Sequence, residues 1–140
     1  HTAAVERAMN AAKEAGAKRA LPLPVSVPSH CSLMKPAADK LAEALQNTNI
    51  ATPKIRVIHN ADVAAYNDVA QIKDALVRQL YSPVRWTETV QLLVREGITQ
   101  SAECGPGKVL AGLAKRIRKE AVCGALTGQE QVAAFIAAHP

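Results

Sequence analysis

Apolar residues recur every three or four positions over much of this 140-residue chain. Side chains at that spacing share one face of a helix, so the pattern predicts amphipathic helices that each bury one side. The predicted helices cover residues 2–15, 34–45, 69–80, 86–96 and 109–117, and a last one follows Gly128. Gly16 and Gly97 directly follow two of these helices, which is the usual place of glycine beyond a helix C-terminus.

Short runs that contain valine and isoleucine separate several of these helices and predict strands. The runs cover residues 21–27, 55–60, 98–104 and 121–126. Because strands alternate with helices in the second half of the chain, we expect an α/β layer structure with parallel strand pairing. A chain of this length can bury one core, so one compact unit is the default expectation.

The stretch from Leu21 to Met34 indicates a strand that leads through a tight turn into a helix. Pro28 has no backbone N–H and therefore suits the end of a strand. His30 follows at this junction, where it can act as a general base or simply cap or pack at the turn. Cys31 is its neighbour. Adjacent side chains on extended backbone point to opposite sides, so a Cys-His dyad is not expected.

The chain is basic, with a formal net charge of +5 and a pI of about 9.3. Such an excess can attract nucleic acid, an anionic membrane or an acidic protein. Four cations lie between Lys115 and Lys119, which indicates either a solvated helix end or a docking patch that Lys18 and Arg19 could extend. Aromatic residues make up 3% of the chain, which weakens the nucleic-acid interpretation. No apolar run approaches the roughly 20 residues that a membrane span needs.

The three cysteines, Cys31, Cys104 and Cys123, are odd in number and widely spaced. That arrangement favours neither a disulfide framework nor a zinc site, and a reducing cytoplasm is the simplest interpretation. Cys104 and Cys123 fall in predicted strands and are expected to be buried.

The Gly105-Pro106-Gly107 turn precedes a helix and could attract an anion. Because it matches no phosphate-binding pattern, a tight turn is the favoured interpretation.

Four segments, taken together, resemble one enzyme family. They are LPLPVSVPSHCSLMKPAAD (residues 21–39), VRQLYSPVRW (77–86), ECGPGKVL (103–110) and GLAKRI (112–117). Their order and spacing are similar to those of bacterial malonyl-CoA:acyl carrier protein transacylases across nearly the whole chain. The resemblance covers only the C-terminal half of such an enzyme.

The resemblance implies an acyltransferase that moves malonyl from coenzyme A to the pantetheine thiol of acyl carrier protein through a malonyl-serine ester. It makes His30 the general base, and it makes the main-chain carbonyl of Gln79 the group that orients His30. It implies no metal, no tightly bound cofactor, and no nucleic-acid or membrane partner. Four basic residues would dock the acidic carrier protein: Lys18, Arg19, Lys115 and Arg116.

The serine nucleophile, which the family places in a Gly-x-Ser-x-Gly elbow, has no counterpart in this sequence. None of the five serines, at positions 26, 29, 32, 82 and 101, stands in that pattern. The chain is therefore expected to be a fragment that is inactive alone and whose missing N-terminal half supplies the serine. By the same resemblance, residues 1–27 would be a remnant of a ferredoxin-like small subdomain. Residues 28–140 would be the C-terminal part of a hydrolase-like α/β large subdomain with a parallel sheet.

Two alternatives stay open. The enzyme could use another acyl-CoA extender unit, because the small residue Ser29 beside His30 does not decide between malonyl and methylmalonyl groups. The chain could instead be a non-catalytic module that binds acidic carrier protein.

Overall fold

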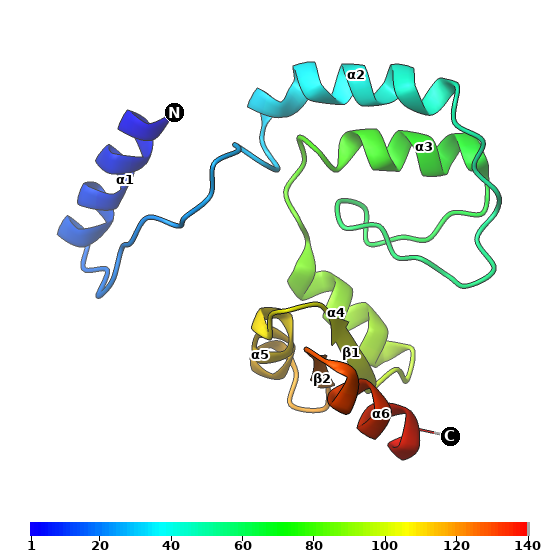
Figure 1. Ribbon diagram of the computed structural model, residues 1–140. Coiled ribbons are helices and arrows are strands. Elements are labelled where there is room, and N and C mark those ends of the chain that lie inside the picture. Colours follow the sequence, from blue (N-terminus) through cyan, green and yellow to red (C-terminus); the bar gives the residue numbers. More distant parts are fainter. Residues whose placement is uncertain (140) are drawn as a thin grey trace.

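A computed structural model describes residues 1–139 of the chain (Figure 1). The elements follow in the order α1 (Thr2–Glu14), a 3₁₀ helix (Ser32–Met34), α2 (Lys35–Gln46), α3 (Val69–Arg78), α4 (Trp86–Arg95), β1 (Gln100–Cys104), α5 (Val109–Ile117), β2 (Val122–Leu126) and α6 (Gln129–Ala138). The helices that the apolar spacing predicts are present, with ends that differ by one or a few residues. Gly16 and Gly97 have φ values of +94° and +82°, a backbone conformation that glycine adopts without a steric penalty.

The two strands form a parallel pair, which confirms the expected α/β class and parallel pairing. Their register joins Gln100 to Val122 at one end and Cys104 to Leu126 at the other. α5 connects the strands and packs on both, and α6 packs on β2 (Figure 1). The structure of the second half is therefore a small mixed α/β layer with helices against two parallel strands.

The core of this layer lies where α4 and α5 meet the start of β2. Val90 of α4, Ala114 of α5 and Ala121 just before β2 are buried together. Partly buried side chains pack around these three: Trp86, Val94, Ile117 and Cys123. Because removing apolar surface from water stabilises by roughly 25 cal/mol per Å², these contacts hold α4 against the β1–β2 layer.

α2 and α3 pack side by side, and the chain direction brings the start of α2 close to the end of α3 (Figure 1). Each helix contributes a buried alanine, Ala38 in α2 and Ala75 in α3. Small side chains let two helix axes approach closely. The residues just before α2 and just after α3 are therefore neighbours in space, although His30 and Gln79 are 49 positions apart in the sequence.

The strand predicted for residues 21–27 is absent, and this expectation was wrong. The segment is extended but belongs to neither strand of the described sheet. Backbone N–H groups of Val25 and Ser29 instead donate to carbonyls only two residues earlier, those of Leu23 and Val27, both at 2.8 Å. Proline removes further donors along this segment, so a ladder of strand hydrogen bonds cannot form.

The strand predicted for residues 55–60 is also absent. The segment makes a single isolated antiparallel bridge, between His59 and Ala64, rather than a ladder. Ile55 and Val57 are exposed, so the β-branched residues that suggested a strand have no sheet neighbour to pack against. His59, at the end of this segment, is buried and its ring lies beside Tyr66 with ring centroids 5.4 Å apart.

The cysteines depart in part from the expected burial. Cys104 is exposed at the end of β1, so the expectation that it is buried was wrong, and Cys31 and Cys123 are partly buried. All three thiols are free, and residues 1–139 contain no cluster of three or more potential metal ligands. In the same range, every helix is too short or too polar to cross a bilayer.

α1 stands apart from the rest of the described structure (Figure 1). Within residues 1–139 it packs on no other helix or strand. Apolar side chains of α1 and of the extended segment after it line an open groove, among them Val5, Met9, Leu21 and Val27. The predicted boundary between residues 1–27 and 28–140 falls at the end of this extended segment and stays a prediction.

Candidate active site

His30 lies between the extended segment and the 3₁₀ helix, and its backbone is unusual. Its φ of +62° is left-handed, which costs a residue other than glycine roughly 1–2 kcal/mol. The backbone N–H of His30 donates to the carbonyl of Leu80 at 2.9 Å, a contact that helps to hold this conformation. We expected no Cys-His dyad because adjacent side chains on extended backbone point to opposite sides, but the backbone at His30 is not extended, so that reason was wrong. The Cys31 thiol instead donates a hydrogen bond to the carbonyl of Pro28 at 3.2 Å.

The ring of His30 is held by the residue that the sequence resemblance pointed to. Nδ1 lies 3.0 Å from the main-chain carbonyl oxygen of Gln79. A carbonyl oxygen can only accept a hydrogen bond, so Nδ1 carries the proton and, in the neutral ring, Nε2 presents a lone pair. This is the geometry that a general base with an orienting partner requires. The catalytic roles of His30 and Gln79 themselves stay predictions.

The end of α3 supplies both partners of His30. Arg78 is the last residue of α3, so Gln79 and Leu80 continue directly from the helix. Carbonyls at a helix C-terminus lack partners within the helix, and the helix dipole places negative partial charge there. The end of α3 therefore offers His30 two acceptor atoms, one for its backbone N–H and one for its ring.

An open depression surrounds the ring of His30. Its volume is about 200 Å³, and its lining comes from three parts of the chain: Ser29, His30 and Met34 before α2, Asn60 in the long loop, and Gln79 and Leu80 after α3. His30 is exposed. A substrate or a second protein segment can therefore reach it.

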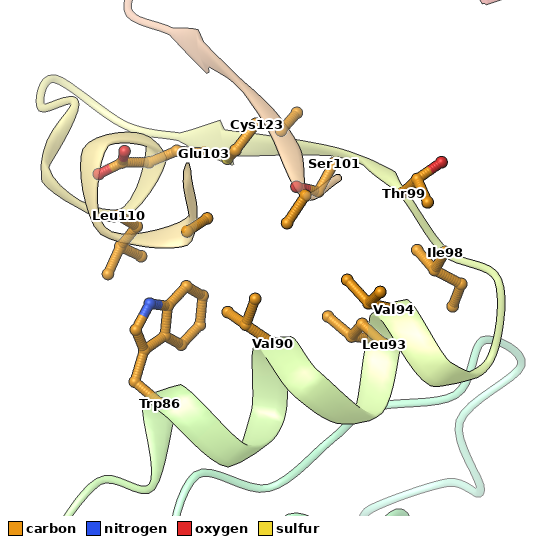
Figure 2. A pocket seen from close by; sticks show the side chains of 13 residues that line it. Trp86, Val90, Leu93, Val94, Ile98, Thr99, Ser101, Glu103, Leu110 and Cys123 are labelled. Carbon is orange, nitrogen blue, oxygen red and sulfur yellow. The ribbon is translucent and has the colours of Figure 1, made fainter. Parts of the chain in front are cut away.

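A second, apolar depression lies between α4, β1 and α5 (Figure 2). Figure 2 shows Trp86, Val90 and Val94 pointing from α4 towards the strands. One polar group of its lining, the Glu103 carboxylate, is used by the fold, because one of its oxygens accepts from the backbone N–H of Ala111 at 2.9 Å. That contact caps the start of α5 with a negative charge, which disfavours an anion after the Gly105-Pro106-Gly107 turn.

The loop that carries Asn60 is tied to α3 by an ion pair that no pattern in the sequence indicates. Asp62 accepts hydrogen bonds from two nitrogens of Arg78, at 2.5 and 2.8 Å, and one from Tyr66 at 3.2 Å. The bonds from Arg78 are the main reason that the pKa of Asp62 lies below its ordinary value. The same pair raises the pKa of Arg78. Functional residues often lie on loops, so the polar loop that contains Asn60 and Asp62 gave only a weak indication that it belongs to the site.

The predicted docking residues are exposed but fall in two places. Lys115 and Arg116 lie in the last turn of α5, and Lys18 and Arg19 follow α1. Figure 1 shows the segment after α1 well apart from α5. The two basic groups therefore form separate patches, and the suggestion that one extends the other does not fit this structure.

Comparisons with known proteins agree on one kind of relative, although no family model matches the chain. A malonyl CoA-acyl carrier protein transacylase of Haemophilus influenzae is 64% identical over 115 residues, which are 82% of this chain and 37% of the relative. The Escherichia coli K12 protein of the same name is 54% identical over 97% of this chain and 44% of its own length. The chain thus spans about two fifths of these curated relatives.

Solved structures lead to the same group. An acyl carrier protein S-malonyltransferase from Vibrio cholerae is 57% identical, with a TM-score of 0.87 over 94% of this chain and 43% of that one. A malonyl-transacylase solved in complex with its type II polyketide acyl carrier protein is 51% identical, with a TM-score of 0.92 over 97% of this chain and 44% of that one.

The lowered pKa of Asp62 predicts an acid-sensitive contribution to stability. A carboxylate whose folded-state pKa lies below the unfolded value of 3.8 stabilises the fold above that pH. The contribution is lost as the pH falls below 3.8 and through the folded-state pKa. We expect the free energy of unfolding to fall less between pH 6 and pH 3 in Asp62→Asn than in the unaltered chain, as measured by urea denaturation at each pH. Tyr66→Phe removes the weaker bond to Asp62 and should change this pH dependence less than Arg78→Lys. Equal pH dependence in all four proteins would contradict the assignment.

Proposed function

This chain belongs to the family of malonyl-CoA:acyl carrier protein transacylases, and from that membership we propose that it is part of an acyltransferase. The enzyme would move a malonyl group from coenzyme A to the pantetheine thiol of acyl carrier protein. One observation above all supports a catalytic part for this chain. It is the 3.0 Å contact between Nδ1 of His30 and the carbonyl of Gln79, which leaves Nε2 free in an open depression.

In the first half of the proposed reaction, His30 activates a serine that lies outside residues 1–140. Nε2 takes the hydroxyl proton as the serine oxygen attacks the thioester carbonyl of malonyl-CoA. The bond from the carbonyl carbon to sulfur then breaks, and protonated His30 returns its proton to the departing thiol of coenzyme A. The products are free coenzyme A, neutral His30 and a malonyl-serine ester.

In the second half, His30 performs the same two transfers on a different thiol. Nε2 takes the proton of the pantetheine thiol, and the sulfur attacks the malonyl-serine ester. The ester bond to the serine oxygen breaks, and that oxygen regains a proton from His30. Throughout, the carbonyl of Gln79 keeps the proton on Nδ1, and the C-terminal end of α3 stabilises the transient imidazolium.

We propose acyl carrier protein as the partner, with Lys115 and Arg116 on one surface and Lys18 and Arg19 on another as the cations that attract it. The support is the net charge of +5, the exposure of these residues, and the relative that was solved with an acyl carrier protein. A cytoplasmic location in fatty acid synthesis fits this partner. The missing part of the parent enzyme would supply the serine.

The division of the chain and the choice of acyl group remain parts of the same proposal. Residues 1–27 would belong to a ferredoxin-like small subdomain, and residues 28–140 to the hydrolase-like large subdomain. Ser29 lines the depression beside His30, so its size bears on which acyl group fits there. A malonyl group is the choice that the names of the curated relatives support.

The proposal predicts that His30 is required for turnover. A chimera in which this chain replaces the matching segment of the Haemophilus influenzae relative provides a full-length enzyme to test. His30→Ala should lower malonyl transfer by about 10²–10⁴-fold, the usual contribution of a positioned acid-base group. Cys31→Ala, at the adjacent position, should leave transfer nearly unchanged. Near-normal turnover of the His30 variant would remove His30 from the mechanism and favour a chain that only binds the carrier protein.

The basic end of α5 should act on the carrier protein and not on malonyl-CoA. In the same chimera, reversing Lys115 and Arg116 to glutamate should raise KM for acyl carrier protein and leave serine loading nearly intact, because exposed charges act mainly on encounter. The defect should shrink at high salt, because exposed charges are largely screened beyond about 10 Å at 0.1 M. Reversing Lys40 and Lys54, exposed cations elsewhere, is the matched control. An equal loss of loading and transfer would contradict a docking role.

A further inference from the structure

The ion pair between Asp62 and Arg78 lies next to the two carbonyls that hold His30. Arg78 ends α3, and Gln79 is the next residue. Every nitrogen of the Arg78 guanidinium is engaged: Nη1 and Nη2 donate to Asp62 at 2.5 and 2.8 Å, and Nε donates to Asp74 at 2.6 Å. A guanidinium that is bound through two parallel hydrogen bonds to one carboxylate is fixed in orientation as well as in position. The last residue of α3 is therefore held on both sides.

The two carboxylates that bind Arg78 are not equivalent. The side chain of Asp62 is 16% exposed, whereas that of Asp74 is 62% exposed. Asp74 also lies on α3 itself, four residues before Arg78, so it cannot tie the helix to anything else. Asp62 comes from a different segment and makes the bidentate contact. It is therefore the partner that fixes the end of α3 relative to the rest of the site.

Asp62 is itself part of a loop that several contacts hold on the other side of the His30 depression. Asn60 lines that depression, and its carbonyl accepts from the backbone N–H of Arg85 at 2.9 Å. Val63 has a φ of +56°, a strained conformation for a β-branched residue that persists only when its surroundings enforce it. The bridge between His59 and Ala64 closes the loop. Asp62 thus joins a tightly held loop to the helix end that presents the carbonyls.

We propose that Asp62 is a positioning residue for His30. Its ion pair with Arg78 fixes the end of α3, the carbonyl of Gln79 then stays in place, and that carbonyl keeps the ring proton on Nδ1. The inference deepens the proposed function and rests on it for its significance, because only the Nδ1–H form leaves Nε2 free to take a proton. Without the ion pair, the last turn of α3 can fray and the neutral ring of His30 can lose its preference for Nδ1–H.

The test reads the tautomer of His30 directly in the full 140-residue chain. Long-range ¹H–¹⁵N spectra of the imidazole distinguish Nδ1–H from Nε2–H at a pH where the ring is neutral. We expect the Nδ1–H form to dominate in the unaltered chain and to lose that dominance in Asp62→Asn. Asp74→Asn makes the same chemical change on the same arginine and should keep the Nδ1–H form. Asp62→Glu keeps the carboxylate and should restore it at least in part.

A purely structural role for Asp62 gives a different result. In that case Asp62→Asn lowers the unfolding temperature, but the tautomer of the folded molecules stays Nδ1–H, and the proposal fails. If Asp62→Asn unfolds, as the loss of its dispersed amide spectrum would show, Arg78→Lys takes its place. Lysine keeps the charge but offers one donor group, so this variant must show the same tautomer change. Loss of the fold in both variants would assign the pair to stability alone and overturn the proposal. The readout needs neither serine nor substrate, so it is independent of whether the chimera transfers malonyl.

Discussion

Two backbone carbonyls at the end of α3 hold His30, and the arrangement of the candidate site depends on that pair of contacts. The carbonyl of Leu80 accepts from the backbone of His30, and the carbonyl of Gln79 accepts from its ring. The first contact supports a left-handed backbone that a histidine seldom adopts, and the second selects the tautomer. A single helix end therefore determines both where the imidazole lies and which of its nitrogens is available.

The packing of α2 on α3 makes these contacts possible. His30 precedes α2, Gln79 follows α3, and the helices lie side by side with their relevant ends together (Figure 1). The loop between the helices also contacts the end of α3, because Asp62 in that loop accepts a hydrogen bond from Arg78. The small α/β layer formed by α4, α5, α6 and the two strands is a separate centre of packing. It is joined to the site through the hydrogen bond between Arg85 and Asn60.

How far the sequence predicts this structure depends on whether a feature is local. The helices could be predicted because the apolar spacing that indicates each one lies within its own segment. The predictions of β1 and β2 were correct because each of these segments pairs with the other in the structure. Residues 21–27 and 55–60 have the composition of strands, but a strand also needs a partner, which composition does not supply. Gln79 acts through its main chain and has no side-chain signature, so only the family resemblance pointed to it. Asp62 was missed because its partner, Arg78, is 16 positions away and no periodicity links them.

In the proposed function, this chain supplies the base and not the nucleophile. The direct measurement is to incubate the 140-residue chain with radiolabelled malonyl-CoA, denature it, and count protein-bound label, in parallel with the Haemophilus influenzae chimera. The account predicts no bound label on the chain alone and about one label per molecule on the chimera, at a residue outside residues 1–140. Stoichiometric label on the isolated chain would contradict it, because a nucleophile among these residues would then form the ester.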